Sequence, residues 1–228
     1  MRTFTGIVQQ LRKHYGEPPA PQAQGPFELV LWENACYLLP DERRLEVFET
    51  LRHKVGLSAA AIDAATDRVL LPIAMRGGMR PEMRVFRWRE IAAITLNQYG
   101  ANLDSILNLP YAAAKKALKQ FPTIGDPGAE KILLLCGVSS GLPLDSNGLR
   151  VLRRLGWGHE QKNYEATYRS VQEALKAEIP GDNEHRKEAH LLLRLHGKTL
   201  CKDKSPLCHE CPVARQCDYV HSAKALKA

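Results

Sequence analysis

Four cysteines near the C-terminal end, in the spacing C-x6-C-x2-C-x5-C, constrain this chain more than any other feature. The segment that carries them, LCKDKSPLCHECPVARQCDY, has too few apolar residues to fold as a core, so we expect a metal centre to hold it together. Four thiolates are the ligand set of a [4Fe-4S] cluster. Zinc sites more often have two C-x2-C pairs, so the spacing favours a cluster over zinc, with disulfides or unligated thiols as a further alternative. The candidate ligands are Cys201, Cys208, Cys211 and Cys217.

Charge and hydropathy limit the class of protein. The 228 residues suffice for one large core or two small ones, and 32 Lys+Arg against 25 Asp+Glu give a formal net charge of +7. A basic chain favours an anionic partner such as nucleic acid. The sequence has neither an apolar run long enough to span a bilayer nor a secretory leader pattern. We therefore expect a monomer without a membrane partner, in the cytoplasm at the nucleoid, where thiols stay reduced.

The spacing of apolar residues predicts helices and no convincing pair of strands, so the expected fold class is all-α. Residues 4–11 form an amphipathic stripe, and residues 16–26, GEPPAPQAQGP, are typical of a linker. Residues 27–39 are apolar on nearly all sides, which predicts a buried central helix. Further helices are predicted over residues 41–56, 58–65, 81–99, 104–109, 110–120 and 127–135.

A short hairpin, Pro122 to Asp126, joins the last two of these helices. Asp126 is a candidate N-cap, and Pro127 suits the first helical position. A tight turn that leads into a helix N-terminus presents backbone N–H groups and the positive end of the helix dipole, which suits a phosphate. A plain connection between two helices is the alternative. Further along, Asp145 precedes another helical pattern, where taken alone it is more often an N-cap than a catalyst.

The hairpin, the aspartate and the four-cysteine segment follow one another in an order that resembles the endonuclease III branch of the helix-hairpin-helix (HhH-GPD) DNA glycosylases. FPTIG (121–125) resembles that family's L-P-G-V-G hairpin, and residues 145–156 resemble its V-D-T-H-x-x-R-V-x-x-R-L-G stretch. The matching positions in that stretch are Asp145, Arg150, Val151, Arg154, Leu155 and Gly156. Leu195, His196, Gly197 and Cys201 resemble the approach to its cluster.

The resemblance implies a fold of two helical lobes. Residues 27–139 would form a six-helix barrel with the helix-hairpin-helix motif at 111–135. Residues 140–228 would form a cluster lobe with the [4Fe-4S] loop at 201–217, completed by the N-terminal helix and linker at 1–26. Double-stranded DNA would lie in the groove between the lobes, with the target base flipped out of the duplex.

The implied activity is that of a DNA N-glycosylase of base excision repair. Asp145 would stabilise an oxocarbenium-like sugar and position the attacking water. The excised base stays open among uracil or thymine in mismatches, oxidised pyrimidines, alkylated purines and mispaired adenine. The residues expected to contact DNA are Thr123, Ile124, Gly125, Asp126, Gly128, Lys131, Tyr37, Leu38, Lys202 and Lys204.

One departure from the family concerns the lysine that forms a Schiff base in bifunctional members, because Pro127 occupies its position. Proline cannot be a nucleophile, which predicts a monofunctional enzyme with little or no lyase activity. Lys131, one turn further along, is the nearest replacement, although a phosphate contact is its more ordinary role. Two alternatives follow: a bifunctional glycosylase and AP lyase that uses a displaced lysine, and a non-catalytic binder of distorted or abasic DNA.

A second departure concerns residues 27–39. The family usually has a glutamine late in this helix that fills the space left by the flipped base, whereas this chain has Tyr37 and Leu38, which either wedge the duplex or belong to the core. Glu33 lies where adenine-removing relatives carry a catalytic glutamate. In an apolar helix its pKa would be raised, so that it could protonate a leaving purine; the alternative is an ion pair with Arg43 or Arg44.

Overall fold

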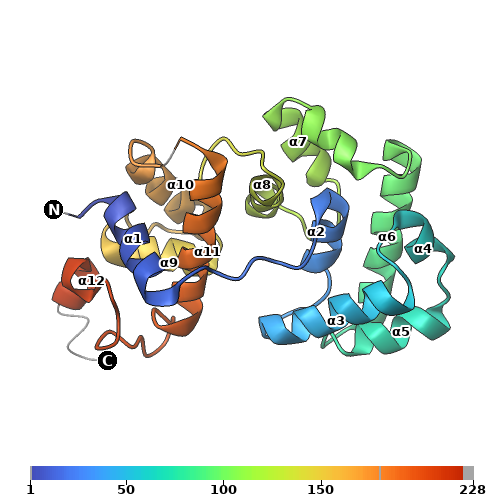
Figure 1. Ribbon diagram of the computed structural model, residues 1–228, viewed down its shortest axis with the longest axis horizontal. Helices are drawn as coiled ribbons and strands as arrows, with labels where there is room; N and C mark the ends of the chain where they lie inside the picture. Colours follow the sequence, from blue (N-terminus) through green and yellow to red (C-terminus); the bar gives the residue numbers. More distant parts are fainter. Residues whose placement is uncertain (1, 180, 223–228) are drawn as a thin grey trace. The chain divides into compact units, whose positions relative to one another are not determined.

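The computed structural model describes residues 2–179 and 181–222, and every regular element within these ranges is a helix (Figure 1). This confirms the predicted all-α class. The chain divides into two compact units, which we call the central unit, Pro21–Val138, and the terminal unit, Met1–Ala20 with Ser139–Ala228. Within the described residues, no helix is both long and apolar enough to cross a membrane.

The central unit is built around α2, whose apolar sequence GPFELVLWE places Leu29, Val30 and Leu31 in the core. The long helix α6 packs against α4 and α5, while α2 packs against α8, η1 and α6 (Figure 1). The elements are α2 Gly25–Glu33, α3 Asp41–Lys54, α4 Ala59–Ala64, α5 Asp67–Met75, α6 Pro81–Tyr99, η1 Leu103–Asn108, α7 Tyr111–Leu118 and α8 Asp126–Leu135.

The helix expected over residues 27–39 ends earlier, at Glu33. Asn34 terminates it, because its backbone N–H and its side-chain amide both bond carbonyls of the last turn, including that of Val30. Pro40 disfavours helical backbone just before it, and Leu38 adopts a left-handed φ of 54°. Tyr37 and Leu38 are consequently 57% and 80% exposed, so the alternative that they belong to the core is wrong.

In the terminal unit, α11 packs against both α9 and α1 (Figure 1). The helices α9 and α11 approach closely at Gly197, where an added Cβ would lie 2.7 Å from the Cβ of Asn147. Phe4, Ile7 and Leu11 of α1 are completely buried in this core. The elements are α1 Phe4–Tyr15, α9 Ser146–Leu155, α10 Tyr164–Leu175, α11 Asn183–Thr199, η2 Ala214–Gln216 and α12 Asp218–His221.

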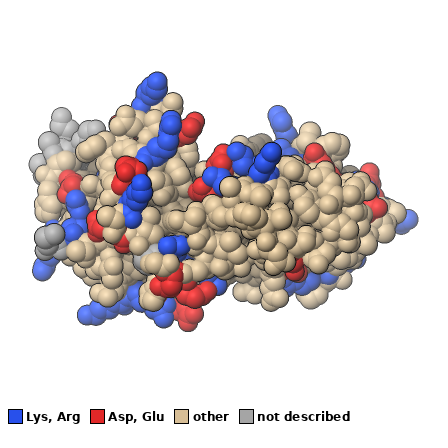
Figure 2. Space-filling model, turned by 90° about the horizontal axis from the view of Figure 1, so that it is seen from above, with Lys and Arg blue, Asp and Glu red and all other residues tan. Residues whose placement is uncertain are grey.

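The excess of basic residues is not concentrated in a single patch on the face seen in Figure 2. There, Lys and Arg side chains lie among Asp and Glu side chains, next to a broad area without charged groups. Across the described residues, many charged side chains are paired within the protein, as in Arg12 with Glu188 and Arg89 with Asp67. The positions of individual side chains therefore say more about a binding site than net charge does.

Candidate active site and cysteine centre

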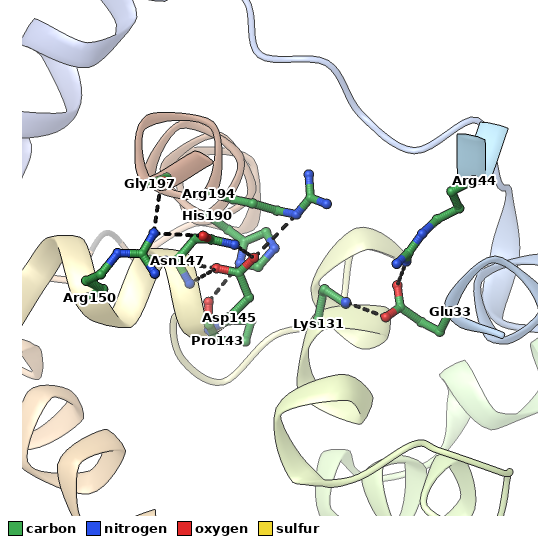
Figure 3. Close-up of polar contacts among 11 residues, drawn as sticks. Glu33, Arg44, Lys131, Pro143, Asp145, Asn147, Arg150, His190, Arg194 and Gly197 are labelled. Atoms are coloured by element: carbon green, nitrogen blue, oxygen red, sulfur yellow. Dashed lines mark hydrogen bonds and ion pairs between the residues drawn. The ribbon is translucent and has the colours of Figure 1, made fainter. Parts of the chain in front are cut away.

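Asp145 is the N-cap of α9, and the two oxygens of its carboxylate have different partners (Figure 3). Oδ1 accepts the backbone N–H groups of Asn147 at 3.0 Å and Gly148 at 2.8 Å. Oδ2 lies 3.4 Å from Nε of Arg194 and 3.3 Å from Nδ2 of Asn147. With its side chain 22% exposed, Asp145 keeps a path to solvent. One oxygen therefore caps the helix, while the other faces side chains.

The surroundings of Asp145 favour its ionised form. Burial by itself would raise the pKa of this carboxyl, but the hydrogen bond from Gly148 and the electrostatic influence of His190 and Arg194 outweigh burial. The pKa of Asp145 consequently lies below its ordinary value. His190 is itself 3% exposed, with Nδ1 2.8 Å from the carbonyl oxygen of Pro143. The site thus holds a carboxylate anion beside nitrogen-bearing side chains.

Arg150 links this site to the cysteine segment. Its Nη2 donates to Oδ1 of Asn147 at 2.9 Å and to the carbonyl oxygen of Gly197 at 2.7 Å. Its Nε donates to the carbonyl oxygen of Cys201 at 2.9 Å. Because Asn147 in turn bonds Asp145, a continuous chain of hydrogen bonds runs from the carboxylate to the first cysteine.

The four predicted ligands, Cys201, Cys208, Cys211 and Cys217, line one cavity, whose other walls are largely apolar. All four are free thiols, which excludes disulfides among them in this structure. Among the described residues, no three His, Cys, Asp or Glu side chains lie close enough together to hold a metal ion. The four thiols therefore share one cavity without forming a closed ligand set.

The electrostatics of this cavity suit a positive centre. Burial, together with repulsion from neighbouring thiolates, raises the pKa of Cys211 to about 11, and burial also raises the pKa of Cys208 and Cys217. Such thiols become thiolates at neutral pH only when a cation binds them. The donor set therefore fits a metal cofactor held by four sulfurs.

The cysteine segment is also fixed by protein contacts. Arg154 is 8% exposed, stacks over the ring of Tyr219 at 4.7 Å, and donates to the carbonyl oxygens of Lys202 at 2.6 Å and Asp203 at 2.9 Å. Lys202 and Lys204, the expected phosphate contacts, are exposed. Arg154 therefore fixes the backbone that carries Lys202 through a hydrogen bond, while both lysine side chains face solvent.

The hairpin differs in detail from its prediction. Gly125, and not Asp126, occupies the N-cap of α8, and Asp126 is the first helical residue. Its carboxylate pairs with Lys119 at 2.7 Å and Lys115 at 3.0 Å. The physical reason is that these lysines of α7 offer a full charge, which competes with capping. Asp126 thus serves to join α7 to α8.

The other hairpin residues divide between core and surface. Ile124 is 6% exposed and donates its N–H to the carbonyl of Phe121 at 3.2 Å, so it serves the turn and the core. Thr123 and Gly125 are exposed, and Gly128 is half-buried in the first turn of α8. A phosphate at this hairpin would accordingly meet Thr123 and Gly125 first.

Glu33, at the end of α2, is shared between two cations (Figure 3). Its Oε2 lies 2.6 Å from Nζ of Lys131 on α8, and its Oε1 lies 3.6 Å from Nη1 of Arg44 on α3. All three side chains are about one fifth exposed. The pairing of Glu33 with Arg44 matches the ion pair that was the alternative to a catalytic Glu33. Lys131, expected to contact phosphate, is bound to the carboxylate of Glu33 in this structure.

Several of these contacts were missed by sequence reasoning. Asn147 lies in the first turn of a capped helix, where its position close to Asp145 was the available signal. Nothing in the local pattern places Arg194 or His190 beside Asp145, because both come from a distant helix. Asn34 was missed for the same reason, since its partners lie on the hairpin.

The sequence has recognisable relatives, although no family model matches it. Over 214 residues it is 30% identical to the thymine/uracil-DNA glycosylase of Pyrobaculum aerophilum, a match that covers 92% of this chain and 88% of that protein. It is 29% identical over 119 residues to endonuclease III of Sulfolobus acidocaldarius and 30% identical over 110 residues to thymine-DNA glycosylase of Aeropyrum pernix. These two matches cover 52% and 48% of this chain and about half the length of each relative.

Solved structures share the fold. Endonuclease III in a non-covalent complex with DNA aligns with a TM-score of 0.77 at 19% identity, over 100% of both chains. A thermostable thymine-DNA glycosylase aligns with a TM-score of 0.75 at 17% identity, over 96% of this chain and 94% of the other. Together with the nearly full-length match to the Pyrobaculum protein, this likeness shows that the chain belongs to the endonuclease III-like, helix-hairpin-helix family of DNA glycosylases.

Proposed function

We propose that the protein is a monofunctional DNA N-glycosylase of base excision repair, which hydrolyses the N-glycosidic bond of a damaged or mismatched base in double-stranded DNA. The observation that carries the proposal is the ionised carboxylate of Asp145, capped through Oδ1 and with Oδ2 facing side chains. A fixed negative charge of this kind stabilises the positive sugar that forms as the base departs. Its second oxygen would orient a water molecule.

The absence of an amine at residue 127 supports hydrolysis without strand cleavage. Pro127 cannot form a Schiff base, and the Lys131 amine is held in an ion pair 2.6 Å from the Glu33 carboxylate. A lyase that uses Lys131 would first have to break this ion pair. The same pair bears on Glu33, which would assist departure of a purine only after release from its cations.

We further propose that the four cysteines hold a [4Fe-4S] cluster. Zinc sites of four cysteines more often have two C-x2-C pairs, whereas this segment has one, and its four thiols line a shared cavity. When bound, the cluster would supply the positive charge that four thiolate ligands require.

The proposed DNA contacts lie on segments that are exposed in the structure. In the central unit they are the hairpin, including Thr123, and the irregular segment that carries Tyr37 and Leu38. Leu38 is an apolar side chain on a left-handed backbone and 80% exposed, which suits insertion into a base stack. In the terminal unit, Lys202 and Lys204 would contribute salt-dependent phosphate contacts.

Base release from a panel of duplexes tests the activity. Two relatives are named for thymine, one of them also for uracil, so the panel begins with G·T and G·U mismatches and continues with oxidised pyrimidines, alkylated purines and mispaired adenine. We expect strand breaks at one of these lesions only after alkali treatment, and none with Asp145→Asn. Efficient trapping of a covalent adduct by borohydride would contradict a monofunctional enzyme, and binding without release from any lesion would contradict catalysis.

A further inference from the structure

The hairpin contains a residue in an unusual conformation. Thr123 has φ 65°, in the left-handed region that β-branched residues rarely adopt. Its neighbour Ile124 is anchored in the core, so the turn cannot relax by moving as a whole. A threonine at this position therefore needs a compensating interaction.

The compensating group is the side chain of Asn34, at the C-terminal end of α2. Oγ1 of Thr123 donates to Oδ1 of Asn34 at 3.1 Å. Nδ2 of the same amide donates to the carbonyl oxygens of Pro122 at 3.1 Å and Val30 at 3.0 Å. One amide thus bonds two consecutive hairpin residues and the last turn of α2.

Each residue of this pair requires the other. Asn34 is only 6% exposed, and its Nδ2 already serves two carbonyls, so Oδ1 needs a donor of its own. The hydroxyl of Thr123 is that donor. Glycine at position 123 would relieve the backbone but leave the buried oxygen of Asn34 without it.

We propose that Asn34 and Thr123 are paired positioning residues, which hold the hairpin in its phosphate-binding form and fix it to the end of α2. The inference rests on the proposed binding of DNA. Tyr37 and Leu38 follow Asn34 by three and four residues, so the same amide ties together the two parts of the central unit that we expect to meet the duplex. Positioning of the hairpin requires the hydroxyl at residue 123 and not only a left-handed backbone there.

Three substitutions at residue 123 separate these effects. Thr123→Val keeps the shape and the β-branch but removes the hydroxyl, and we expect affinity for an undamaged duplex to fall about tenfold, the size expected when a buried acceptor loses its donor. Thr123→Gly relieves the backbone and lacks the hydroxyl, so a similar fall is expected. Thr123→Ser keeps the donor and should bind within about twofold of wild type.

A matched control distinguishes positioning from a general loss of stability. Thr50→Val in α3 removes a hydroxyl bond to the Glu46 carbonyl in the same unit, so it and Thr123→Val should lower the Tm by similar amounts. We expect affinity for the duplex to fall in the valine and glycine variants of residue 123 and to stay at the wild-type value in Thr50→Val. Affinity that fell equally in Thr50→Val would reflect lower stability and would contradict a positioning role.

The outcomes overturn different statements. If wild-type protein binds no duplex at all, the proposed function fails. If wild type binds and Thr123→Val matches it in affinity, the positioning role is wrong. Full binding by Thr123→Gly would likewise show that the hydroxyl is unnecessary, and a loss of binding by Thr123→Ser equal to that of the valine variant would show that the methyl group matters instead.

Discussion

We expect Asp145 to have two roles, as a helix cap and as a catalytic charge, and substitutions can separate them. Its Oδ1 accepts two backbone N–H groups at the start of α9, and its Oδ2 carries the charge that faces Arg194. Asparagine caps helices as well as aspartate does but has no charge, whereas alanine can do neither. Asp145→Asn should therefore lose the chemistry and keep the cap, and Asp145→Ala should lose both.

The magnitudes follow from these contacts. Loss of the cap in Asp145→Ala should cost about 1 kcal/mol of stability, or roughly 2–4 °C in Tm for a chain of this size. Asp145→Asn gives up only a partly exposed ion pair with Arg194, which contributes less than about 1 kcal/mol. Both variants lack the preorganised charge, so the rate of base release should fall by at least about a hundredfold in each.

Two measurements check this division: thermal unfolding, and single-turnover release of the base that the duplex panel identifies. The expected pattern is a hundredfold or larger loss of rate in both variants, with a lower Tm in the alanine variant alone. The reasoning would be refuted if Asp145→Asn kept its rate within about tenfold of wild type, or if it lost as much Tm as Asp145→Ala.

Three further results are expected. Because the pKa of Asp145 is lowered, its ionised form should persist as pH falls to about 5, so the excision rate should show no acid limb there. The contribution of Asp145 to stability should be present above the ordinary pKa of 3.8 and be lost only as pH falls through the lower pKa of the folded state. Acid titrations of unfolding for wild type and Asp145→Asn check this loss by their difference. Arg150→Met breaks the link between α9 and the cysteine segment and should slow excision about tenfold or more, whereas Arg153→Met, which removes only an exposed ion pair, should not; equal rates would remove Arg150 from the site. Cys208→Ser should lower the bound iron, sulfide and visible absorbance while Cys136→Ser leaves them unchanged, and bound zinc without sulfide would contradict the cluster.

The features that sequence could predict are those with local patterns. Helical spacing predicted the all-α class, and a polar residue before an apolar repeat predicted the cap at Asp145, which α9 confirms. The spacing of the cysteines predicted a shared ligand set, and the four thiols do line one cavity. α11 was overlooked although Ala189, Leu192, Leu193 and His196 follow helical spacing, because its many charged residues weaken the average signal.

What sequence could not predict depends on contacts between residues far apart along the chain. The end of α2 was misplaced because apolar residues continue to Leu39, while the amide of Asn34 that stops the helix is committed to the hairpin. An apolar setting was likewise expected for Glu33, yet Lys131 and Arg44 reach it from two other helices. Side-chain pairing of this kind emerges only when the helices pack.

The discontinuous make-up of the terminal unit has a consequence for how the protein is made. During synthesis the central unit leaves the ribosome as one uninterrupted stretch and can fold. Phe4, Ile7 and Leu11 of α1 stay exposed to solvent until α9 and α11 have been synthesised. Asp145 and the four cysteines therefore arrive in the last two fifths of translation. A chain released before residue 145 would carry the hairpin but lack the carboxylate that we propose to be catalytic, so we expect such products to be inactive.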